Sequence, residues 1–309
     1  MTGNMEKSFN NTFVANGLER EHNRRKDPEW LARKLRDPES VFLPVRQSKV
    51  LVTNGEAPTP VLFSPKQLGQ YKQTDSGVFL GEREGRAYFA VELEETDFGA
   101  FEEAGKFKDL RSVAPLLSRE DGAILAYAQA LGYWHRRNRF CGVCGARNEI
   151  REAGHSLCCV NPECGAAHFP RTDPAIIVLI ERGGKCLLGR QQTWARGVYS
   201  VLAGFVEPGE STEGAVAREI FEEVGVRVTN IRYHSSQPWP FPCSLMLGFT
   251  AEAEDDQITL GDSELEHARW FGRSELLEAV ENGAVKLPTP VSISYRLIEE
   301  WLEKECRPT

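Results

Sequence analysis

The sequence lacks several features by which large classes of proteins are recognised. No apolar run reaches the roughly 18 residues that a membrane-spanning helix needs, and the polar opening MTGNMEKSFNN lacks the apolar core of a secretory signal. Positive charge is not in excess either. The formal net charge of −8 argues against broad, non-specific binding to a nucleic-acid backbone, although it leaves room for a local basic site. We therefore expect a cytoplasmic protein with no membrane partner.

The patterns of two common enzyme classes are also missing. The sequence has no P-loop with its lysine, and its six histidines are too isolated to argue for a Ser-His-Asp triad. We find no internal repeat and no long low-complexity tract. A length of 309 residues exceeds what one small core needs, so we expect about two domains and a small additional module.

The most informative stretch is GFVEPGESTEGAVAREIFEEVGV, residues 204–226. It follows without departure the pattern G, five residues, E, seven residues, R-E-U-x-E-E-x-G-U, in which U is a bulky apolar residue. Its glycines allow tight turns, Ser211 or Thr212 can cap a helix start, and Gly225 stands where a left-handed residue would end that helix. The stretch therefore predicts a turn and then a helix of about 13 residues.

The predicted helix has an apolar stripe and an acidic face. At about 100° per residue its apolar side chains recur on one side, and three carboxylates gather beside them, those of Glu219, Glu222 and Glu223. Like charges this close are destabilising unless a cation lies among them, and oxygen ligands suit a hard ion such as Mg²⁺ or Mn²⁺. The alternative is an ordinary charged face on which Arg218 pairs with Glu222, but it explains neither the glycines nor the full spacing.

Four cysteines precede this stretch with the spacing of a metal site. They form two pairs, Cys141-x-x-Cys144 and Cys159-x₄-Cys164, separated by fourteen residues. Four thiolates close a tetrahedron around Zn²⁺, so the pairs predict one structural zinc ion per chain. A pair of disulfides is the alternative, which a reducing cytoplasm disfavours.

The ligand set of this cysteine cluster has rivals. Cys158 adjoins Cys159, and His155 and His168 are close enough in sequence to replace a cysteine. We choose Cys159 because that choice leaves VNPE as the turn of the second pair.

The rest of the chain predicts strands followed by a sheet with helices. Short strand-like fragments run to about residue 112, and helical spacing follows over residues 118–138. After the cysteines, AIIVLIE and CLLGRQ flank a Gly-Gly turn, and further strands are expected at YSVLAGFV, VRVTNIRYHSSQ, SLMLGFTAEAE and ARWFG. Helical spacing returns in residues 290–304. The expected result is an α+β fold, with helices on both faces of a mixed sheet.

The segment SQPWPFPCSLM, residues 236–246, is the second diagnostic stretch. Its three prolines predict a stiff loop that cannot be a central strand, and they hold the rings of Trp239 and Phe241 with little entropy left to lose. Such rings suit stacking on a flat base. Alone, a loop of this kind more often packs locally, but beside the acidic helix and the cysteine cluster it favours a ligand contact.

Taken in order, these motifs resemble the NADH pyrophosphatases of the Nudix superfamily, whose Nudix box is the 204–226 pattern. The resemblance covers about residues 111 to 305, and SQPWPFP distinguishes this family from other Nudix hydrolases. It implies a Nudix α/β/α sandwich with a mixed sheet at 171–309, a zinc ribbon at 139–170, and a Nudix-like, β-rich N-terminal domain with a connecting helix at 1–138.

The resemblance also implies an activity and partners. Members hydrolyse NADH or NAD⁺ at the diphosphate to give nicotinamide mononucleotide and AMP, with more than one Mg²⁺ or Mn²⁺ ion per site. In bacterial members the same chemistry removes an NAD cap from RNA 5′ ends. Members are homodimers in which each site borrows groups from the partner, and we expect the same here.

Carried over residue by residue, the resemblance assigns the ion site, but it offers no single rule for the catalytic base. The metal ligands are the backbone carbonyl of Ala203 and the carboxylates of Glu219, Glu222, Glu223 and Glu264; for the last, Asp262 and Glu266 are rivals. Glu223 is our first choice for orienting or deprotonating the attacking water, with Glu222 as its rival, and Arg218 holds a carboxylate in place.

The resemblance assigns substrate contacts as well. Phe205 resembles a base-stacking ring, and Ser294 replaces a small alanine of the family, which leaves the detail of that contact open. The full set of expected substrate contacts is Phe169, Phe205, Gln237, Pro238, Trp239, Pro240, Phe241, Pro242, Cys243, Ser244 and Ser294.

Two other functions stay open. A broader Nudix hydrolase of ADP-ribose or other nucleoside diphosphate derivatives would keep the box but would not need SQPWPFP. A non-catalytic nucleotide- or RNA-binding module would be expected to have a degraded box, and this box is intact. The sequence ranks neither NADH, NAD⁺ and NAD-capped RNA nor the two candidate ions.

Overall fold

The computed structural model describes residues 2–14, 17–69, 77–93, 101, 103–261 and 264–304. The chain forms two compact units, each assembled from separate stretches. The first unit comprises Met1–Thr12, Asp173–Trp239 and Ser244–Thr309, and the second comprises Phe13–Thr172 and Pro240–Cys243. Within the described residues, no helix is both long enough and apolar enough to cross a membrane.

The first unit is built on a mixed sheet. Its strand order is β12-β13-β9-β10-β14, with β11 paired to β9. Strand β13 runs parallel to β9, whereas the other neighbours are antiparallel. The strands are β9 (Asp173–Arg182), β10 (Lys185–Gln191), β11 (Leu202–Phe205), β12 (Val228–Trp239), β13 (Ser244–Ala253) and β14 (Leu265–Gly272).

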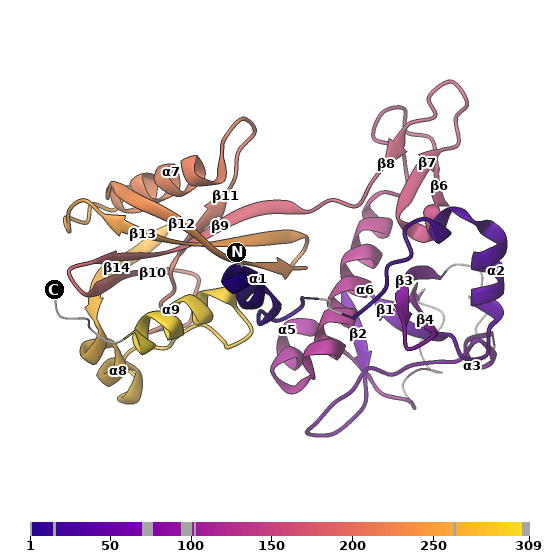
Figure 1. Ribbon diagram of the computed structural model, residues 1–309, viewed down its shortest axis with the longest axis horizontal. Coiled ribbons are helices and arrows are strands. Elements are labelled where there is room, and N and C mark those ends of the chain that lie inside the picture. Colours follow the sequence, from indigo (N-terminus) through magenta and orange to yellow (C-terminus); the bar gives the residue numbers. More distant parts are fainter. Residues whose placement is uncertain are drawn as a thin grey trace. The chain divides into compact units, whose positions relative to one another are not determined.

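Helices cover both faces of this sheet. Helix α7 (Thr212–Val224) lies on one face, and α8 (Arg273–Glu281) and α9 (Ile293–Glu303) lie on the other (Figure 1). Alternation along β9 explains the layers, because Val178 packs into the core beneath α7 while its neighbour Ile177 packs into the core beneath α9. The expected α+β fold, an α/β/α sandwich with a mixed sheet, is confirmed.

Local turn and cap signals define these elements well. Gly183 and Gly184 join β9 to β10 with φ values of 53° and 75°, which non-glycine residues rarely adopt. Ser211 caps α7 by accepting a hydrogen bond from the Gly214 N–H, and Gly225 ends the helix with φ 71°. The predicted helix of about 13 residues therefore spans Thr212–Val224, and Ser211 rather than Thr212 is its cap.

The SQPWPFP segment is only partly a loop. Strand β12 continues as far as Trp239, and Pro238 pairs with Leu245 of β13. Proline is tolerated here because β12 is the edge strand and needs no N–H on its outer side. Residues 240–243 then form the turn to β13. The expected loop is therefore confined to residues 240–243. Residues 236–239 belong to the edge strand β12, whereas Ser244–Met246 belong to β13, an interior strand of the sheet, so the expectation for the whole segment is wrong at both ends.

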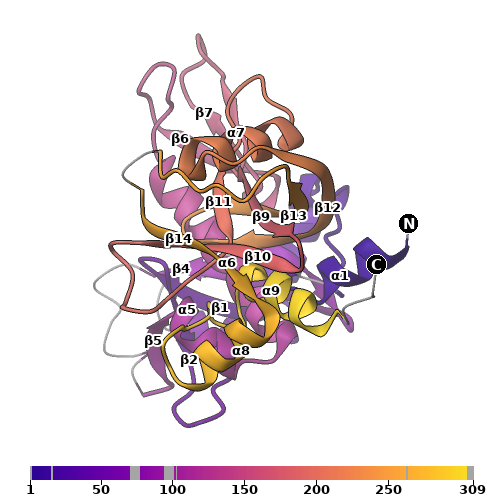
Figure 2. The same cartoon turned by 90° about the vertical axis from the view of Figure 1, so that its left-hand side faces the viewer.

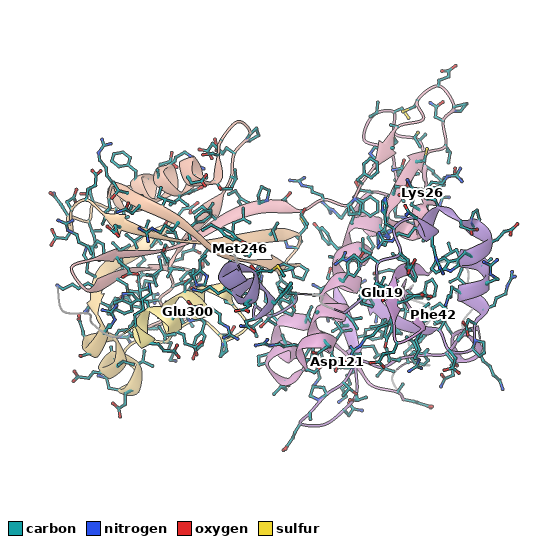
Figure 3. The ribbon with its side chains drawn as sticks, viewed as in Figure 1. Glu19, Lys26, Phe42, Asp121, Met246 and Glu300 are labelled. Carbon is teal, nitrogen blue, oxygen red and sulfur yellow. The ribbon has the colours of Figure 1, made fainter. Side chains whose placement is uncertain are left out.

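The second unit contains a five-stranded sheet of order β3-β4-β1-β2-β5. Helix α6 (Arg119–Arg137) contacts four of its strands, begins after the N-cap Ser118 and ends at Asn138, as the helical spacing of residues 118–138 predicted. Side chains such as Phe42, labelled in Figure 3, fill the core. The strands are β1 (Val41–Arg46), β2 (Lys49–Val52), β3 (Val78–Arg83), β4 (Arg86–Glu92) and β5 (Lys106–Asp109).

Smaller elements complete the two units (Figure 2). The cysteine segment forms a three-stranded sheet of order β6-β7-β8, and in the first unit helix α1 contacts the edge strand β12. No local sequence pattern predicted the contact between α1 and β12. The bounds are α1 (Thr2–Phe9), α2 (Pro28–Arg36), α3 (Pro65–Gly69), α5 (Leu110–Val113), β6 (Asn148–Arg151), β7 (Ser156–Cys159) and β8 (Ala167–His168).

Candidate active site

The acidic face of α7 lies against the glycine that opens the box. A Cβ built on Gly204 would lie 1.9 to 2.4 Å from the carboxylate atoms of Glu219, so no larger residue fits there without moving that carboxylate. Strand β11 thus ends with bare backbone against the first of the three glutamates. The glycine has a packing role here rather than a turn role.

Arg218 fixes the carboxylates around it. Its guanidinium donates two hydrogen bonds to Glu210, at 2.6 and 2.9 Å, and one to Glu222 at 2.8 Å, and it lies 3.0 Å from Glu219. It also donates to the backbone oxygen of Phe205 at 3.0 Å. The pairing with Glu222 that the simpler interpretation proposed is therefore present, but as one contact of a larger network. The contact of Glu210 with Arg218 was not predicted, although the box pattern itself contains this glutamate.

The electrostatics of this face suit a cation. Burial raises the pKa of the Glu219 carboxyl, Arg218 lowers it, and the neighbouring carboxylates of Glu222 and Glu264 raise it further. Clustered carboxylates that repel one another offer the all-oxygen donor set that Mg²⁺ and Mn²⁺ prefer. The residues therefore fit a hard divalent ion.

A cavity of about 200 Å³ opens beside these groups within the first unit. Glu223, whose side chain is 3% exposed, and Ala203 form part of its wall. Aromatic and apolar side chains line the rest of the cavity, together with the hydroxyl groups of three serines. Those lining residues include Gln191, Trp194, Ser200, Trp239, Met246, Ser292, Ile293 and Ser294.

The cavity brings together four residues that the sequence motifs indicated for different roles: Ala203, Glu223, Trp239 and Ser294. Ser294 donates to or accepts from Ser200 at 2.6 Å, so the substitution of the family's alanine adds a second hydroxyl to the wall. Trp194, Ser200 and Met246 were not predicted. A single Trp or Ser outside a motif gives no signal in sequence, and Met246 ends the 236–246 stretch but was not singled out within it.

Other predicted substrate contacts do not line this cavity. Phe169 is 65% exposed in the second unit and Phe205 is 59% exposed in the first. Phe241 packs against the ring of Phe13 at 5.8 Å and the guanidinium of Arg111 at 4.4 Å. The Gln237 side chain is completely buried. Pro238, Pro240, Pro242, Cys243 and Ser244 are likewise not among the lining residues.

The structure distinguishes Glu264 from Glu266 as a candidate metal ligand. Glu266 accepts a hydrogen bond from Arg190 at 3.1 Å, whereas Glu264 acts electrostatically on Glu219. Asp262 lies outside the described residues. Among the described candidates, Glu264 is thus the one that belongs to the acidic face.

The four chosen cysteines gather at one place in the second unit. The sulfur atoms of Cys141, Cys144, Cys159 and Cys164 lie within 4.8 Å of one another. Backbone N–H groups lower the pKa of Cys141 and of Cys144 to about 7, whereas burial raises that of Cys159 to about 12. Cys141 and Cys144 are therefore the thiols that ionise most readily for metal binding.

The three alternative zinc ligands, Cys158, His155 and His168, are not part of the four-cysteine cluster. Cys158 adjoins Cys159 on β7, where successive side chains point to opposite faces, and its sulfur contacts the Gly165 oxygen at 3.8 Å. The ring of His155 bonds to Tyr127 at 2.7 Å. His168 Nε2 lies 3.3 Å from the Cys141 sulfur, as a neighbour of the cluster.

Three family models match successive parts of this chain. An NADH pyrophosphatase-like rudimentary NUDIX domain matches residues 39–134, the NADH pyrophosphatase zinc ribbon domain matches residues 136–169, and the NUDIX domain matches residues 170–288. The middle match contains all four clustered cysteines.

Curated relatives match over most of their length. The NAD-capped RNA hydrolase NUDT12 of Homo sapiens is 32% identical over 94% of this chain and 73% of that protein. The NAD-capped RNA hydrolase NudC of Stutzerimonas stutzeri (strain A1501) is 41% identical over 73% of this chain and 77% of its own. NudC of Mycobacterium bovis (strain BCG / Pasteur 1173P2) is 38% identical, with 82% and 83% covered. With its box, zinc ribbon and cavity in place, this chain belongs to the NADH pyrophosphatase family of the Nudix hydrolases.

Proposed function

We propose that this protein hydrolyses the diphosphate bond of NADH and NAD⁺ to nicotinamide mononucleotide and AMP, and that it removes NAD caps from RNA 5′ ends. One observation carries the proposal: a single cavity is lined by Ala203 and Glu223 of the acidic site and by the ring of Trp239. A reacting phosphate and a flat ring of the same substrate can therefore be held next to each other.

The acidic face supplies the chemistry. Glu219, Glu222, Glu223 and Glu264, with the carbonyl of Ala203, would hold more than one Mg²⁺ or Mn²⁺ ion. Such ions neutralise the diphosphate charge and lower the pKa of a bound water. Glu223 takes the proton of the attacking water on its carboxylate, because this side chain belongs to the cavity wall. Arg218 keeps Glu219 and Glu222 in place through its contacts at 3.0 and 2.8 Å.

Another part of the cavity wall supplies recognition. The Trp239 ring offers a face for stacking on a nucleobase or nicotinamide, and the Ser200 and Ser294 hydroxyls offer hydrogen bonds to the polar edge of the ligand. An NAD cap presents the same diphosphate and the same rings as free NAD⁺. The relatives named as NAD-capped RNA hydrolases support the extension to RNA.

The test is product analysis by mass spectrometry. NADH, NAD⁺ and NAD-capped RNA are supplied at equal concentration, each with Mg²⁺, with Mn²⁺ and without a divalent ion. We expect nicotinamide mononucleotide from NAD⁺ and from NAD-capped RNA, its reduced form from NADH, and each product only with an ion. ADP-ribose is the comparison substrate. If it is cleaved as efficiently as NADH, the protein is a broader nucleoside diphosphate hydrolase.

We further propose one Zn²⁺ per chain at the four cysteines, a homodimer in solution, and residence in the cytoplasm. The cysteine geometry and the zinc ribbon match support the zinc ion. The dimer rests on the family resemblance. Light scattering after gel filtration measures it directly, and a mass near 34.6 kDa, that of one chain, would contradict it.

A further inference from the structure

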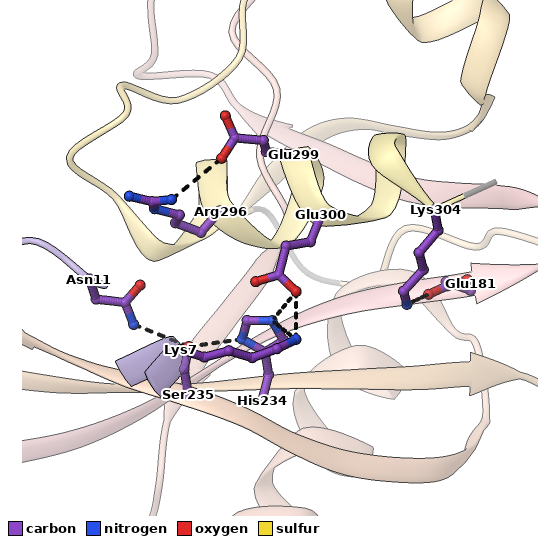
Figure 4. Close-up of polar contacts among 9 residues, drawn as sticks. All are labelled: Lys7, Asn11, Glu181, His234, Ser235, Arg296, Glu299, Glu300 and Lys304. Carbon is purple, nitrogen blue, oxygen red and sulfur yellow. Dashed lines mark hydrogen bonds and ion pairs between the residues drawn. The ribbon is translucent and has the colours of Figure 1, made fainter. Parts of the chain in front are cut away.

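The N-terminal segment, defined as residues 7–12, is bound to the strand that supplies Trp239. Lys7 Nζ donates to the Glu300 carboxylate of α9 at 2.5 Å and lies 3.1 Å from His234 Nε2 on β12 (Figure 4). Asn11 Nδ2 donates to the Ser235 hydroxyl at 3.1 Å, a contact also drawn there. The segment therefore joins β12 to α9 from outside the sheet.

This contact covers the free edge of the sheet. Strand β12 has a single neighbour, β13, so some of its backbone groups point to the outside. At Ser236 both of these groups are satisfied by the N-terminal segment: the N–H donates to the Ser8 hydroxyl at 3.0 Å, and the carbonyl accepts from Asn11 at 2.9 Å. Asn11 is itself only 3% exposed. The edge strand is thus fixed three residues before Trp239.

Gln237 extends the connection into the interior. Its side chain has no exposed surface. The amide nitrogen donates to the Thr12 carbonyl at 3.1 Å and to the Val291 carbonyl at 2.7 Å, and the amide oxygen accepts from the Ile293 N–H at 2.8 Å. Both amide hydrogens are used by backbone carbonyls, so none is left to donate to a substrate.

Two of the segments that Gln237 connects, β12 and the start of α9, contribute residues to the cavity wall. Trp239 follows it on β12, and Ser292, Ile293 and Ser294 at the start of α9 form another part of the wall. Val291, Ile293 and Gln237 are all buried, so a lost hydrogen bond there cannot be replaced by bulk water. The Gln237 amide therefore links the strand that carries Trp239 to the start of α9, and both of these form parts of the cavity wall.

We propose that the N-terminal segment and Gln237 are positioning residues of the substrate cavity, which hold the Trp239 wall and the Ser294 wall at a fixed separation. Gln237 then acts through its neighbours and does not touch the substrate. The proposal rests on the function proposed above, because it assigns these residues to substrate binding and not to the chemistry on α7.

Steady-state kinetics with NADH test it through Asn11→Ala and Gln237→Met. The buried groups left unpaired should displace the walls, and we expect KM to rise about 5- to 50-fold. The kcat value should stay within about twofold of the wild type, since the carboxylates of α7 are untouched. Asn54→Ala is the control, because it removes an exposed amide of the same type in the second unit, outside the N-terminal segment, and should leave both constants unchanged.

Hydrogen–deuterium exchange is the second measurement, and it requires no turnover. In Asn11→Ala the amides of residues 236–239 and 291–295 should exchange faster, while those of the three-stranded cysteine sheet should not. An unchanged KM with unchanged exchange overturns the proposal, and so does a fall in kcat at constant KM. If Gln237→Met does not fold, Asn11→Ala decides alone. A wild type that cleaves no NADH refutes the proposed function, and exchange still decides whether the segment holds the walls.

Discussion

At the scale of single residues, the site depends on a glycine and on one arginine. Gly204 gives the Glu219 carboxylate the space that any Cβ would occupy, and Arg218 binds two carboxylates of its own helix and Glu210 of the preceding turn. Both residues act on groups that repel one another, and both limit where those groups can go. The carboxylates are therefore held close together before an ion binds, as an ion site requires.

Replacing Glu223 by Gln should lower kcat for NADH by at least about a hundredfold, because it removes the group that takes the proton of the water. The fold should persist, as the two side chains have the same shape. Activity and thermal unfolding are measured together. Glu213→Gln on the same helix is the matched control, since this glutamate is exposed in the first turn. A near-wild-type rate for Glu223→Gln would remove the residue from the metal and base roles.

Gly204→Ala should weaken the binding of Mn²⁺ and lower activity, because the added methyl group displaces the Glu219 carboxylate. Titration of the protein with Mn²⁺, followed by electron paramagnetic resonance, measures the affinity without turnover. Gly272→Ala is the control, since a Cβ at Gly272 would meet nothing within 4 Å. Equal Mn²⁺ affinity in Gly204→Ala and in wild type would show that the contact with Glu219 has no part in ion binding.

At the scale of elements, the sequence predicts the features that depend on neighbouring residues, such as the first and last residues of a helix. Helix α7 begins and ends where Ser211 and Gly225 indicate, and α6 begins after Ser118, because caps act within one turn of their own position. The continuation of β12 to Trp239 depends on its place at the sheet edge, and Trp194 reaches the cavity through the fold alone. Such arrangements between distant segments leave no periodicity in the sequence.

The cysteine segment leaves several of its apolar side chains exposed, those of Val143, Ile150 and Val160, so its stability should depend on metal. We expect about one Zn²⁺ per chain by elemental analysis, and loss of both zinc and soluble protein in Cys144→Ser. Cys158→Ser is the matched control, because its sulfur lies outside the four-cysteine cluster. If instead Cys158→Ser loses zinc and Cys159→Ser keeps it, our choice between these two neighbours is wrong.

Trp239 belongs to the end of β12, and its ring should serve recognition and not chemistry. Trp239→Ala should lower kcat/KM for NADH by about 5- to 150-fold, the effect of losing one stacked base. Cleavage of ADP-ribose, which lacks the second ring system, should fall much less, since the carboxylates act on the same bond. Equal losses on both substrates would mean that the ring does not contact the nicotinamide, and no loss on either would mean that the ring only packs.

At the scale of the whole molecule, each unit is closed by residues far apart in sequence. In the first unit, Lys7 near one end of the chain meets Glu300 near the other. In the second, the ring of His155 beside the cysteine segment bonds to Tyr127 of α6 at 2.7 Å. Such contacts tie small elements to larger ones, so their loss should lower the stability of the unit that they close.

His155 should make the stability of the second unit depend on pH. Burial, and then the charges of Arg25 and Arg20, lower the pKa of His155 to about 3, against about 6.5 for an unfolded chain. Between these values the unfolded chain binds more protons. The contribution of His155 is therefore complete above pH 6.5 and is lost as the pH falls toward 3, by about 2 kcal/mol at pH 5.

Thermal unfolding at pH 7.5 and pH 5.0 measures this contribution. His155→Gln keeps an acceptor for Tyr127 but cannot titrate, so its melting temperature should fall less between the two pH values than that of the wild type. His267→Gln is the matched control, because His267 also bonds to a tyrosine, Tyr199 at 2.9 Å, but is exposed. If the melting temperature of His155→Gln falls as much as that of the wild type, the burial of the His155 ring does not determine the acid stability of the unit. The pH dependence would then come from other histidines such as His135, whose pKa is also lowered by burial.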